Sequence, residues 1–326
     1  MTLPHARRSK LIKTILGKPT LTSRKLLKAS TLPHGSQWNH IAPSSHGHWY
    51  IKHIQRKAAV AERAAEVAAK ASDLVILYFH GGGFRVGTSV MYSDSFLLVL
   101  DRLEKVHDVK SAILSLEYGL VPEHTWYSLM DQAHAAYLYL LDLGIPASKI
   151  IIGGDSAGGH MTGMLLPRLK AEGYPLPLGG MLISPLVTFD GTAPSFSAHA
   201  AFDCLPDSMV HQDLTDLFPE LKTIATNEEE VRQQHLAKVS PIHSDMTGLP
   251  PLLVSFGQRE RFANDVEQYI ARLVRHGVDV HVVSRHNEPH VYIVTPLLAS
   301  SLRVWAKDCA LLADWCSQRV KQSDVY

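Results

Sequence analysis

The chain has 326 residues, of which 46% are hydrophobic and 19% charged, with 32 Lys and Arg against 31 Asp and Glu. This balance excludes an intrinsically disordered protein, and the 18 prolines and 21 glycines exclude a collagen or a long coiled coil. No apolar run is long enough to form a membrane-spanning helix, so we expect a soluble globular protein.

Charge is unevenly distributed along the chain. Residues 1–70 contain 13 basic residues against only Glu62 and Glu66, a net charge of +11, and the remainder carries −10. The basic segment from Arg7 to Lys28 is typical of a transit peptide, of a helix resting on an anionic membrane surface, or of a solvated helical face. We expect an intracellular, cytoplasmic protein, with a mitochondrial or peripheral membrane location as alternatives. The acidic remainder argues against nucleic acid as a partner.

From residue 74 onward, short β-branched runs alternate with helical patterns. This alternation predicts an α/β fold with a mostly parallel central sheet and helices on both faces. A possible antiparallel edge strand, His48–Ile54, and an exposed helix, Gln55–Ala71, precede it. The predicted strands are Leu74–Phe79, Ala112–Leu116, Lys149–Ile152, Gly180–Ile183, Leu252–Phe256 and Val278–Val283, and the predicted helices are Tyr92–Val106, Ser128–Leu141, Gly158–Glu172, Asn264–His276 and His290–Gln318.

Two stretches depart from this alternation. Residues 190–245 are too long for a simple crossover between strands, so we interpret them as an insertion that forms a helical cap over the strand ends. Residues 1–45 are interpreted as a basic helical segment that belongs to the same cap. Residues 46–326 then form a single main domain.

Cysteine and metal-ligand patterns are sparse. Three cysteines are too few for a disulfide framework, and their spacing fits no zinc site, so we expect buried thiols. The sequence contains no metal-binding cluster, and we expect no metal and no cofactor.

The strongest local motif is Gly154–Gly158, a GxSxG sequence between a predicted strand and a predicted helix. A strand that turns sharply into a helix presents the central Ser156 as a nucleophile, and flanking glycines leave room for the neighbouring backbone. A tight structural turn is the alternative interpretation. A second glycine-rich sequence, His80–Phe84, follows another strand and can present backbone N–H groups to a substrate oxygen. It lacks the lysine and the spacing of a phosphate-binding loop.

A nucleophilic serine needs a base and an acid that orients it. His290 follows the last predicted strand, where the base of such an elbow is expected. The loop after the strand Leu252–Phe256 supplies two carboxylates, Glu260 and Asp265, and the spacing does not choose between them.

These motifs together resemble the hormone-sensitive-lipase group of α/β-hydrolases, which includes esterases, lipases and arylacetamide deacetylases, and in particular its fungal branch of steryl acetyl hydrolases. The resemblance covers approximately residues 74–295 and implies an α/β-hydrolase fold. The matching segments, in order, are His80–Phe84, Leu116–His124, Gly154–Gly159, Leu182–Pro185, Gly248–Pro251 and Pro289–Tyr292.

Carried over position by position, the resemblance implies that Ser156 is the nucleophile and His290 the base. The backbone N–H groups of Gly82, Gly83 and Ala157 would form the oxyanion hole. The implied reaction is hydrolysis of small carboxylic esters with short acyl groups, such as acetyl esters, through an acyl-enzyme. A non-hydrolytic binding protein and an acyl transferase of the same fold are the alternatives.

The resemblance places Glu260 at the position of the triad acid. This stretch departs from the family pattern in three ways: a glutamate stands where an aspartate is frequent, Asn264 replaces a trailing aspartate, and Arg259 and Arg261 flank the glutamate, where either could divert its carboxylate. Asp265 therefore stays the second choice.

Several aromatic residues belong to the matching segments or lie close to them. We expect four of these side chains to line the substrate pocket: Phe84, Trp126, Tyr127 and Tyr292.

Overall fold

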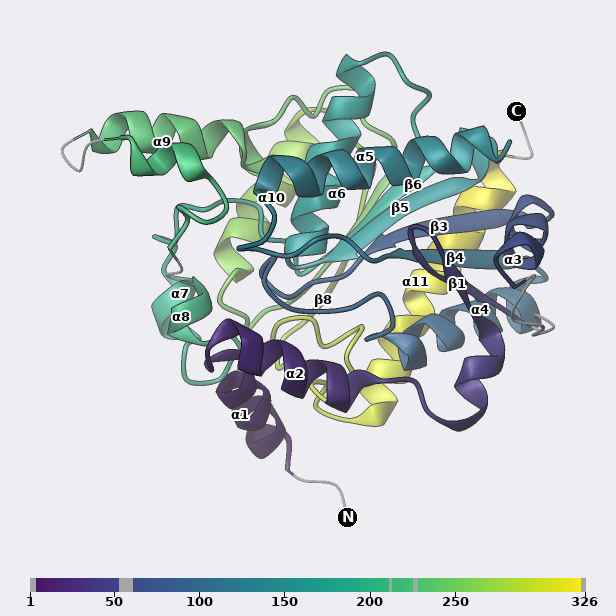
Figure 1. Cartoon of the computed structure of the whole chain (residues 1–326), viewed down its shortest axis with the longest axis horizontal. Helices are drawn as coiled ribbons and strands as arrows, with labels where there is room; N and C mark the ends of the chain where they lie inside the picture. The colour runs from purple at the N-terminus through teal and green to yellow at the C-terminus, as the bar shows by residue number, and fades with distance from the viewer. Residues whose placement is uncertain (1–3, 53–60, 211–212, 225–227, 324–326) are drawn as a thin grey trace.

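A single eight-stranded sheet forms the centre of the protein (Figure 1). The computed structural model describes residues 4–52, 61–210, 213–224 and 228–323. The strand order is β1-β2-β4-β3-β5-β6-β7-β8, in which β2 runs antiparallel to both of its neighbours, β1 and β4, and the other neighbours are parallel. The strands are β1 (Ile41–Ser44), β2 (Gly47–Ile51), β3 (Leu74–Phe79), β4 (Ser111–Leu116), β5 (Ile150–Asp155), β6 (Gly179–Ile183), β7 (Leu252–Gly257) and β8 (Val280–Arg285).

Helices cover both faces of the sheet, as the sequence predicts. Alternate residues of β3 point to opposite faces: Leu77 packs in the core beneath α3, α5, α6 and α10, and Ile76 in the core beneath α4 and α11. Two buried faces explain why the central strands are apolar throughout. The helices are α1 (His5–Leu16), α2 (Thr20–Thr31), α3 (Ala61–Lys70), α4 (Ser93–His107), α5 (Trp126–Asp142), α6 (Ala157–Ala171), α7 (Ser195–Ala198), α8 (Asp207–Val210), α9 (Glu229–Lys238), α10 (Ala263–Arg275) and α11 (Leu302–Ser323), with 3-10 turns η1 (Gly35–His40), η3 (Ala147–Lys149), η4 (Pro219–Lys222) and η5 (Pro241–His243).

The predicted start of the last helix was wrong. The sequence pattern predicts a helix from His290, but α11 begins at Leu302, and the residues between form turns. Val291 has a positive φ of 52°, which a right-handed helix does not allow, and Pro296 offers no N–H group. His290 therefore lies in a loop and not at a helix N-terminus.

The N-terminal edge of the sheet also differs from expectation. β2 confirms the antiparallel edge strand, but β1 lies outside it and the sequence analysis missed it. The predicted helix Gln55–Ala71 is observed as α3, and its first part, residues 55–60, lies outside the described residues.

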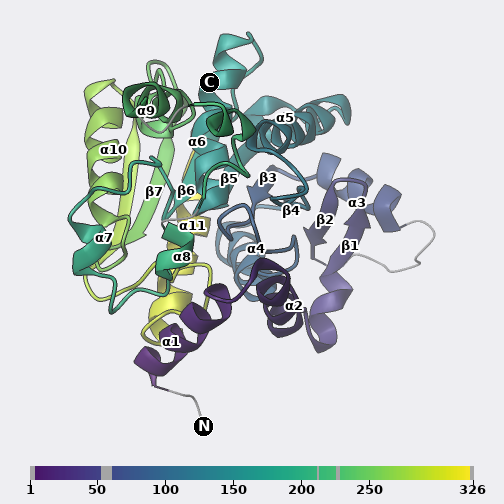
Figure 2. The ribbon, with the colours of Figure 1, turned by 60° about the vertical axis from the view of Figure 1, so that its left-hand side comes forward.

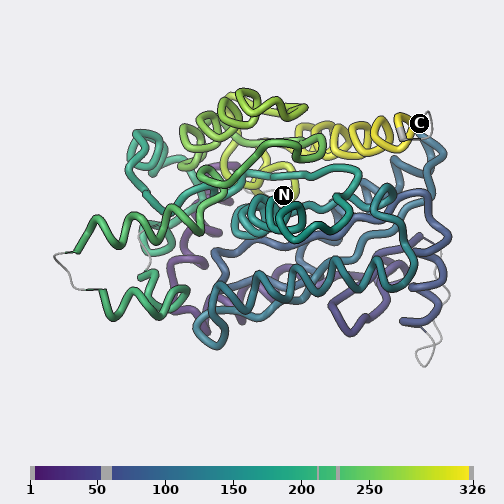
Figure 3. The backbone as a smooth tube through the Cα atoms, turned by 90° about the horizontal axis from the view of Figure 1, so that it is seen from above, coloured from purple at the N-terminus to yellow at the C-terminus, as the bar shows by residue number. Residues whose placement is uncertain are grey.

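The two stretches that interrupt the alternation lie near each other in space. Figure 2 shows α1 and α2 on the same side of the molecule as α7 and α8, which belong to the connection between β6 and β7. In contrast, α9 extends away from the sheet (Figures 1 and 3). No helix among the described residues is long and apolar enough to cross a membrane.

Candidate active site

Ser156 lies in a strained turn between β5 and α6. Its φ and ψ are 52° and −114°, and it is 7% exposed. A Cβ atom at Gly158 would lie 1.9 Å from the carbonyl oxygen of Phe79, and one at Gly154 would lie 2.4 Å from the backbone of Gly158. Only glycine fits these two positions. This explains why glycines flank Ser156 at the turn between β5 and α6.

The candidate oxyanion donors surround Ser156. Gly82 and Gly83 have φ values of 116° and 60° and line the same cavity as Ser156, while Ala157 is the first residue of α6. Within the described part of the chain, none of the three N–H groups donates a hydrogen bond to another backbone group. Backbone N–H groups without such a partner are the kind of donor that an oxyanion hole needs.

A buried carboxylate holds the glycine-rich loop against the serine turn. Asp155 accepts hydrogen bonds from the Tyr92 hydroxyl at 2.6 Å, the Tyr78 hydroxyl at 3.0 Å and the Gly81 N–H at 2.9 Å. Burial raises the pKa of Asp155 to about 6, although these hydrogen bonds oppose the shift. Asp155 therefore connects β5, β3 and the loop that carries Gly82 and Gly83.

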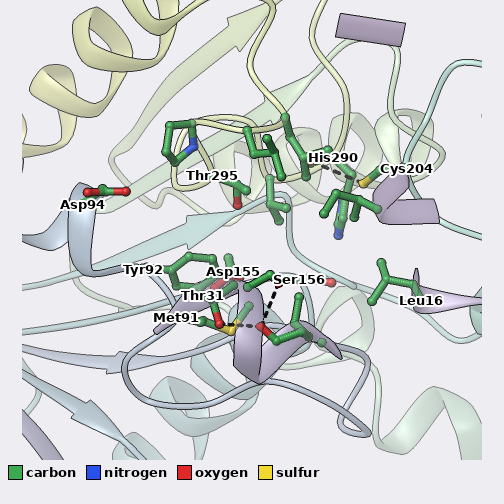
Figure 4. Close-up of a pocket in the computed structure, with 18 of the residues that line it drawn as sticks. Leu16, Thr31, Met91, Tyr92, Asp94, Asp155, Ser156, Cys204, His290 and Thr295 are labelled. Carbon is green, nitrogen blue, oxygen red and sulfur yellow. Dashed lines mark hydrogen bonds between the residues drawn. The ribbon is translucent and has the colours of Figure 1, made fainter. Parts of the chain in front are cut away.

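His290 lies in the loop after β8 and faces the same cavity as Ser156. Its ring is buried, and neither ring nitrogen has a hydrogen-bond partner among the described residues. Burial alone would lower the pKa of His290, but the nearby carboxylates of Glu260, Asp203 and Asp155 outweigh it and raise the pKa. Figure 4 shows His290 beside Cys204, and Tyr92 beside Asp155.

The structure brings Glu260, and not Asp265, to the imidazole. Oε1 of Glu260 lies 3.8 Å from Nδ1 of His290, and both groups are buried. This separation is longer than a hydrogen bond, and neither atom has another partner among the described residues. Catalytic contacts of this kind often tighten only when substrate binds. Asp265 lies on α10, where burial raises its pKa to about 6 with a further contribution from Asp190.

The two arginines beside Glu260 point away from it. The guanidinium of Arg259 lies 3.8 Å from the centre of the Phe202 ring. Nη1 of Arg261 donates to Oδ1 of Asp207 at 2.6 Å. Neither arginine therefore diverts the Glu260 carboxylate into a salt bridge.

Two cavities meet at Ser156. Cavity A, of about 310 Å³, is bounded by the N-terminal helices, the glycine-rich loop and the loop after His290, and its lining includes Ile12, Leu16, Leu27, Gly82, Ser156, His290 and Leu297. Cavity B, of about 180 Å³, lies toward the connection between β6 and β7, and its lining includes Ser156, Leu186, Phe196, Val210, Leu214 and Phe262. Gly83, Ser156, Leu205 and Met209 contribute to both linings.

The four aromatic residues expected in the pocket line neither cavity. Phe84 is fully buried, and Trp126 donates to Nε2 of His160 at 2.9 Å. The Tyr127 and Tyr292 hydroxyls donate to Glu220 and Asp308, respectively. This expectation was wrong because three of the four side chains are buried in the core and Tyr127 is 43% exposed, whereas other residues from the N-terminal helices, the glycine-rich loop and the cap line the cavities.

Sequence reasoning missed Asp203. Its carboxylate accepts hydrogen bonds from the N–H of Arg261, the residue after Glu260, and from the N–H of His290. Sequence reasoning also missed the cavity-lining residues of α1 and α2. Within the described residues, no cluster of His, Cys, Asp and Glu could hold a metal ion. All three cysteines are free and buried, as expected.

A family model described as the alpha/beta hydrolase fold matches residues 76–294, and the chain belongs to this family. The fold is shared with a solved esterase of the bacterial hormone-sensitive lipase family. That structure superposes with a TM-score of 0.75 at 24% identity, over 98% of this chain and 99% of the other. Another, the hormone-sensitive-lipase homologue EstE7 from a metagenome library, has a TM-score of 0.75 at 23% identity, over 98% and 100%. At these identities the likeness concerns the fold alone.

Curated relatives match over about two thirds of their length. The chain is 27% identical to an acetyl-hydrolase of Streptomyces hygroscopicus, over 65% of this chain and 66% of the relative. It is 29% identical to an esterase of Acinetobacter venetianus, over 67% and 68%. A carboxylesterase of Mycobacterium tuberculosis is 26% identical over 67% and 66%. The family and these names support a carboxylic ester hydrolase.

Proposed function

We propose that this protein is a serine esterase that hydrolyses small carboxylic esters. The observation that carries the proposal is the strained turn at Ser156, which opens into a cavity shared with the buried imidazole of His290. Glu260 serves as the acid that orients this imidazole, and the N–H groups of Gly82, Gly83 and Ala157 serve as the oxyanion hole. None of these roles requires a metal or a cofactor.

In the proposed reaction, Nε2 of His290 takes the proton of the Ser156 hydroxyl as its oxygen attacks the ester carbonyl. The carbonyl oxygen becomes an oxyanion held by backbone N–H groups. The imidazolium then protonates the departing alcohol, which leaves an acyl-Ser156 ester. Water, deprotonated by the same imidazole, attacks this ester, and the proton returns to Ser156 as the carboxylic acid departs.

The two cavities separate the two parts of the ester. The departing alcohol must lie near the imidazole that protonates it, and His290 lines cavity A but not cavity B. We therefore assign the alcohol part to cavity A and the acyl part to cavity B. An apolar cavity of about 150 Å³ accommodates a benzene molecule. Cavity B, at about 180 Å³, thus fits an acyl group of about six carbon atoms and favours short-chain esters over long fatty acyl esters.

The direct test is release of p-nitrophenol from acetate, butyrate, hexanoate and octanoate esters by the wild-type protein and by Ser156→Ala. We expect turnover of the shorter esters and a loss of several orders of magnitude in the variant. Equal release by both proteins would contradict the serine mechanism. Wild-type protein that binds the esters without hydrolysing them would instead support a binding function.

We also propose that the basic N-terminal segment contacts an anionic membrane surface weakly. Ile12, Leu16 and Leu27 line cavity A, and Arg24 forms an ion pair with Glu123 at 2.8 Å, so the segment is part of the substrate site. Its exposed residues combine positive charge and apolar area, a combination that anionic lipid attracts. They include Arg7, Lys10, Leu11, Lys18, Leu21, Lys25, Leu26, Lys28 and Leu32.

Sedimentation with phosphatidylcholine vesicles, with and without phosphatidylserine, tests this contact. We expect binding only to the anionic vesicles, weakened by salt and by the double substitution of Lys25→Glu and Lys28→Glu. The charge-matched control substitutes two exposed lysines near α9, Lys222→Glu and Lys238→Glu. Equal binding of the two double variants, or equal binding to neutral vesicles, would overturn the proposal.

A further inference from the structure

A second buried carboxylate from the cap lies next to the proposed catalytic residues. Asp203 is 1% exposed and lies between α7 and α8, in the connection between β6 and β7. It lines neither cavity. The reaction proposed above gives it no role, yet a buried carboxylate is costly unless its oxygens are satisfied.

Three backbone N–H groups satisfy Asp203. Oδ1 accepts hydrogen bonds from the N–H of Cys204 at 2.7 Å and from the N–H of His290 at 3.0 Å. Oδ2 accepts from the N–H of Arg261 at 2.8 Å. Two of these three donors lie more than fifty residues away in the chain, so the contacts join separate loops and not one local turn.

The partners of Asp203 are the backbones that carry the proposed acid and base. Arg261 directly follows Glu260, and the other distant N–H group belongs to His290 itself. One carboxylate thus holds both loops at the place where Oε1 of Glu260 lies 3.8 Å from Nδ1 of His290. Residues adjacent to Asp203 form part of the cavity wall: Cys204 lines cavity A, and Leu205 lines both cavities.

We infer that Asp203 is a positioning residue, which sets the separation of Glu260 and His290 and links it to the cap segment that lines the substrate cavities. This inference rests on the proposed esterase function. Asp203 does not contact the reacting atoms. Its effect passes through the backbone of the two loops and through its negative charge beside the imidazole.

The charge makes this role distinguishable from a merely structural one. Three carboxylates act on the His290 imidazole: Glu260 from the acid loop, Asp203 from the cap and Asp155 from the end of β5. The uncharged neighbours are the Phe262 ring, 5.0 Å from the His290 ring and nearly perpendicular to it, and Cys204, whose Sγ lies 3.9 Å from the His290 carbonyl oxygen. Removing one of the three negative charges lowers the pKa of His290, and the base then stays neutral to lower pH.

The test compares Asp203→Asn with Asp213→Asn. Asp213 lies in the same connection between β6 and β7 but is exposed, and its side chain accepts a hydrogen bond from the nearby N–H of Thr215. For a short p-nitrophenyl ester we expect Asp203→Asn to lower kcat by about 10- to 100-fold, the range for hydrogen bonds to a charged group, with little change in KM. The midpoint of the acid limb of kcat/KM moves to lower pH in Asp203→Asn only, and Asp213→Asn behaves as the wild type.

If part of the Asp203→Asn protein unfolds, a second measurement still tests the inference. It is the rate constant for labelling of Ser156 by a fluorophosphonate. This rate constant refers to each folded molecule, and we expect it to fall in Asp203→Asn with the same shift of its pH profile. An unshifted pH profile, or a labelling rate constant equal to that of Asp213→Asn, would overturn the inference. If the wild type itself neither hydrolyses esters nor reacts at Ser156, the proposed function has failed instead.

Discussion

The Ser184 hydroxyl donates a hydrogen bond to Oε2 of Glu260 at 2.7 Å. Its oxygen also accepts from the N–H of Val291 at 3.1 Å, the residue that follows His290. The N–H of Gly257 donates to the same Glu260 oxygen at 3.1 Å. Oε2 is thus occupied, and Oε1 is directed to the imidazole. The end of β6 thereby orients a carboxylate that follows β7.

Ser184→Ala removes this orientation. We expect kcat for a short p-nitrophenyl ester to fall by about 10-fold or more, because a buried carboxylate loses a hydrogen bond worth about 1–3 kcal/mol. Steady-state kinetics measures the loss. Ser184→Thr retains a hydroxyl and should recover part of the activity. Unchanged kcat in Ser184→Ala would show that Glu260 needs no such support.

Glu260→Gln and Asp265→Asn distinguish the two candidate acids. Only Glu260 lies beside His290, so we expect Glu260→Gln to lower kcat by about 10³- to 10⁴-fold, as loss of a triad acid does, and Asp265→Asn to leave kcat close to wild type. Hydrolysis of p-nitrophenyl acetate measures both. The reverse ranking would assign the acid to Asp265.

The pH dependence of kcat/KM reports the ionisation of the proposed base in the free enzyme. The carboxylates around His290 raise its pKa despite its burial, and the imidazole must be neutral to accept a proton. Activity is therefore lost as pH falls, with a midpoint above the ordinary histidine value of about 6.5. A midpoint at or below that value would contradict the electrostatic argument. In Glu260→Gln, the midpoint of the residual activity should move down.

Tyr92→Phe removes one of the three donors to the buried Asp155. We expect the free energy of unfolding to fall by about 1–3 kcal/mol, since an acceptor in the core loses a partner. Urea unfolding followed by circular dichroism measures this change. Tyr50→Phe is the matched control and should cost less, because its hydroxyl contacts only neutral groups, the Ser93 hydroxyl at 2.8 Å and the Ser89 carbonyl oxygen at 3.3 Å. Equal losses would show that the Asp155 charge adds nothing.

The assignment of acyl and alcohol parts predicts opposite effects of filling the two cavities. Val210 lines only cavity B and Leu297 only cavity A. We expect Val210→Trp to reduce hydrolysis of hexanoate relative to acetate esters, and Leu297→Trp to discriminate against bulky alcohols at constant acyl length. Kinetics on matched ester series measures both ratios. If Val210→Trp instead discriminates between alcohols and Leu297→Trp between acyl chain lengths, the acyl part lies in cavity A and the alcohol part in cavity B.

Much of the fold followed from local patterns. The six parallel strands were predicted close to their observed bounds, and five of them, β3 to β7, are the short, apolar runs expected of strands buried on both faces. The turn at Ser156 was equally visible, since its glycines are required by backbone contacts within a few residues and with the adjacent strand. In contrast, the loop at His290 makes a distant contact that no local pattern reveals, the hydrogen bond from the Val291 N–H to the Ser184 hydroxyl.

The sequence by itself determined the order of strands and helices and the presence of a serine turn, a glycine-rich loop and a late histidine. The tertiary structure decided which groups meet: Glu260 and not Asp265 beside His290, Asp203 between their loops, and the N-terminal helices as the wall of cavity A. The physical reason is that local patterns depend on neighbours in the chain. Contacts within the site depend on the pairing of β5, β6, β7 and β8, which brings together residues far apart in sequence.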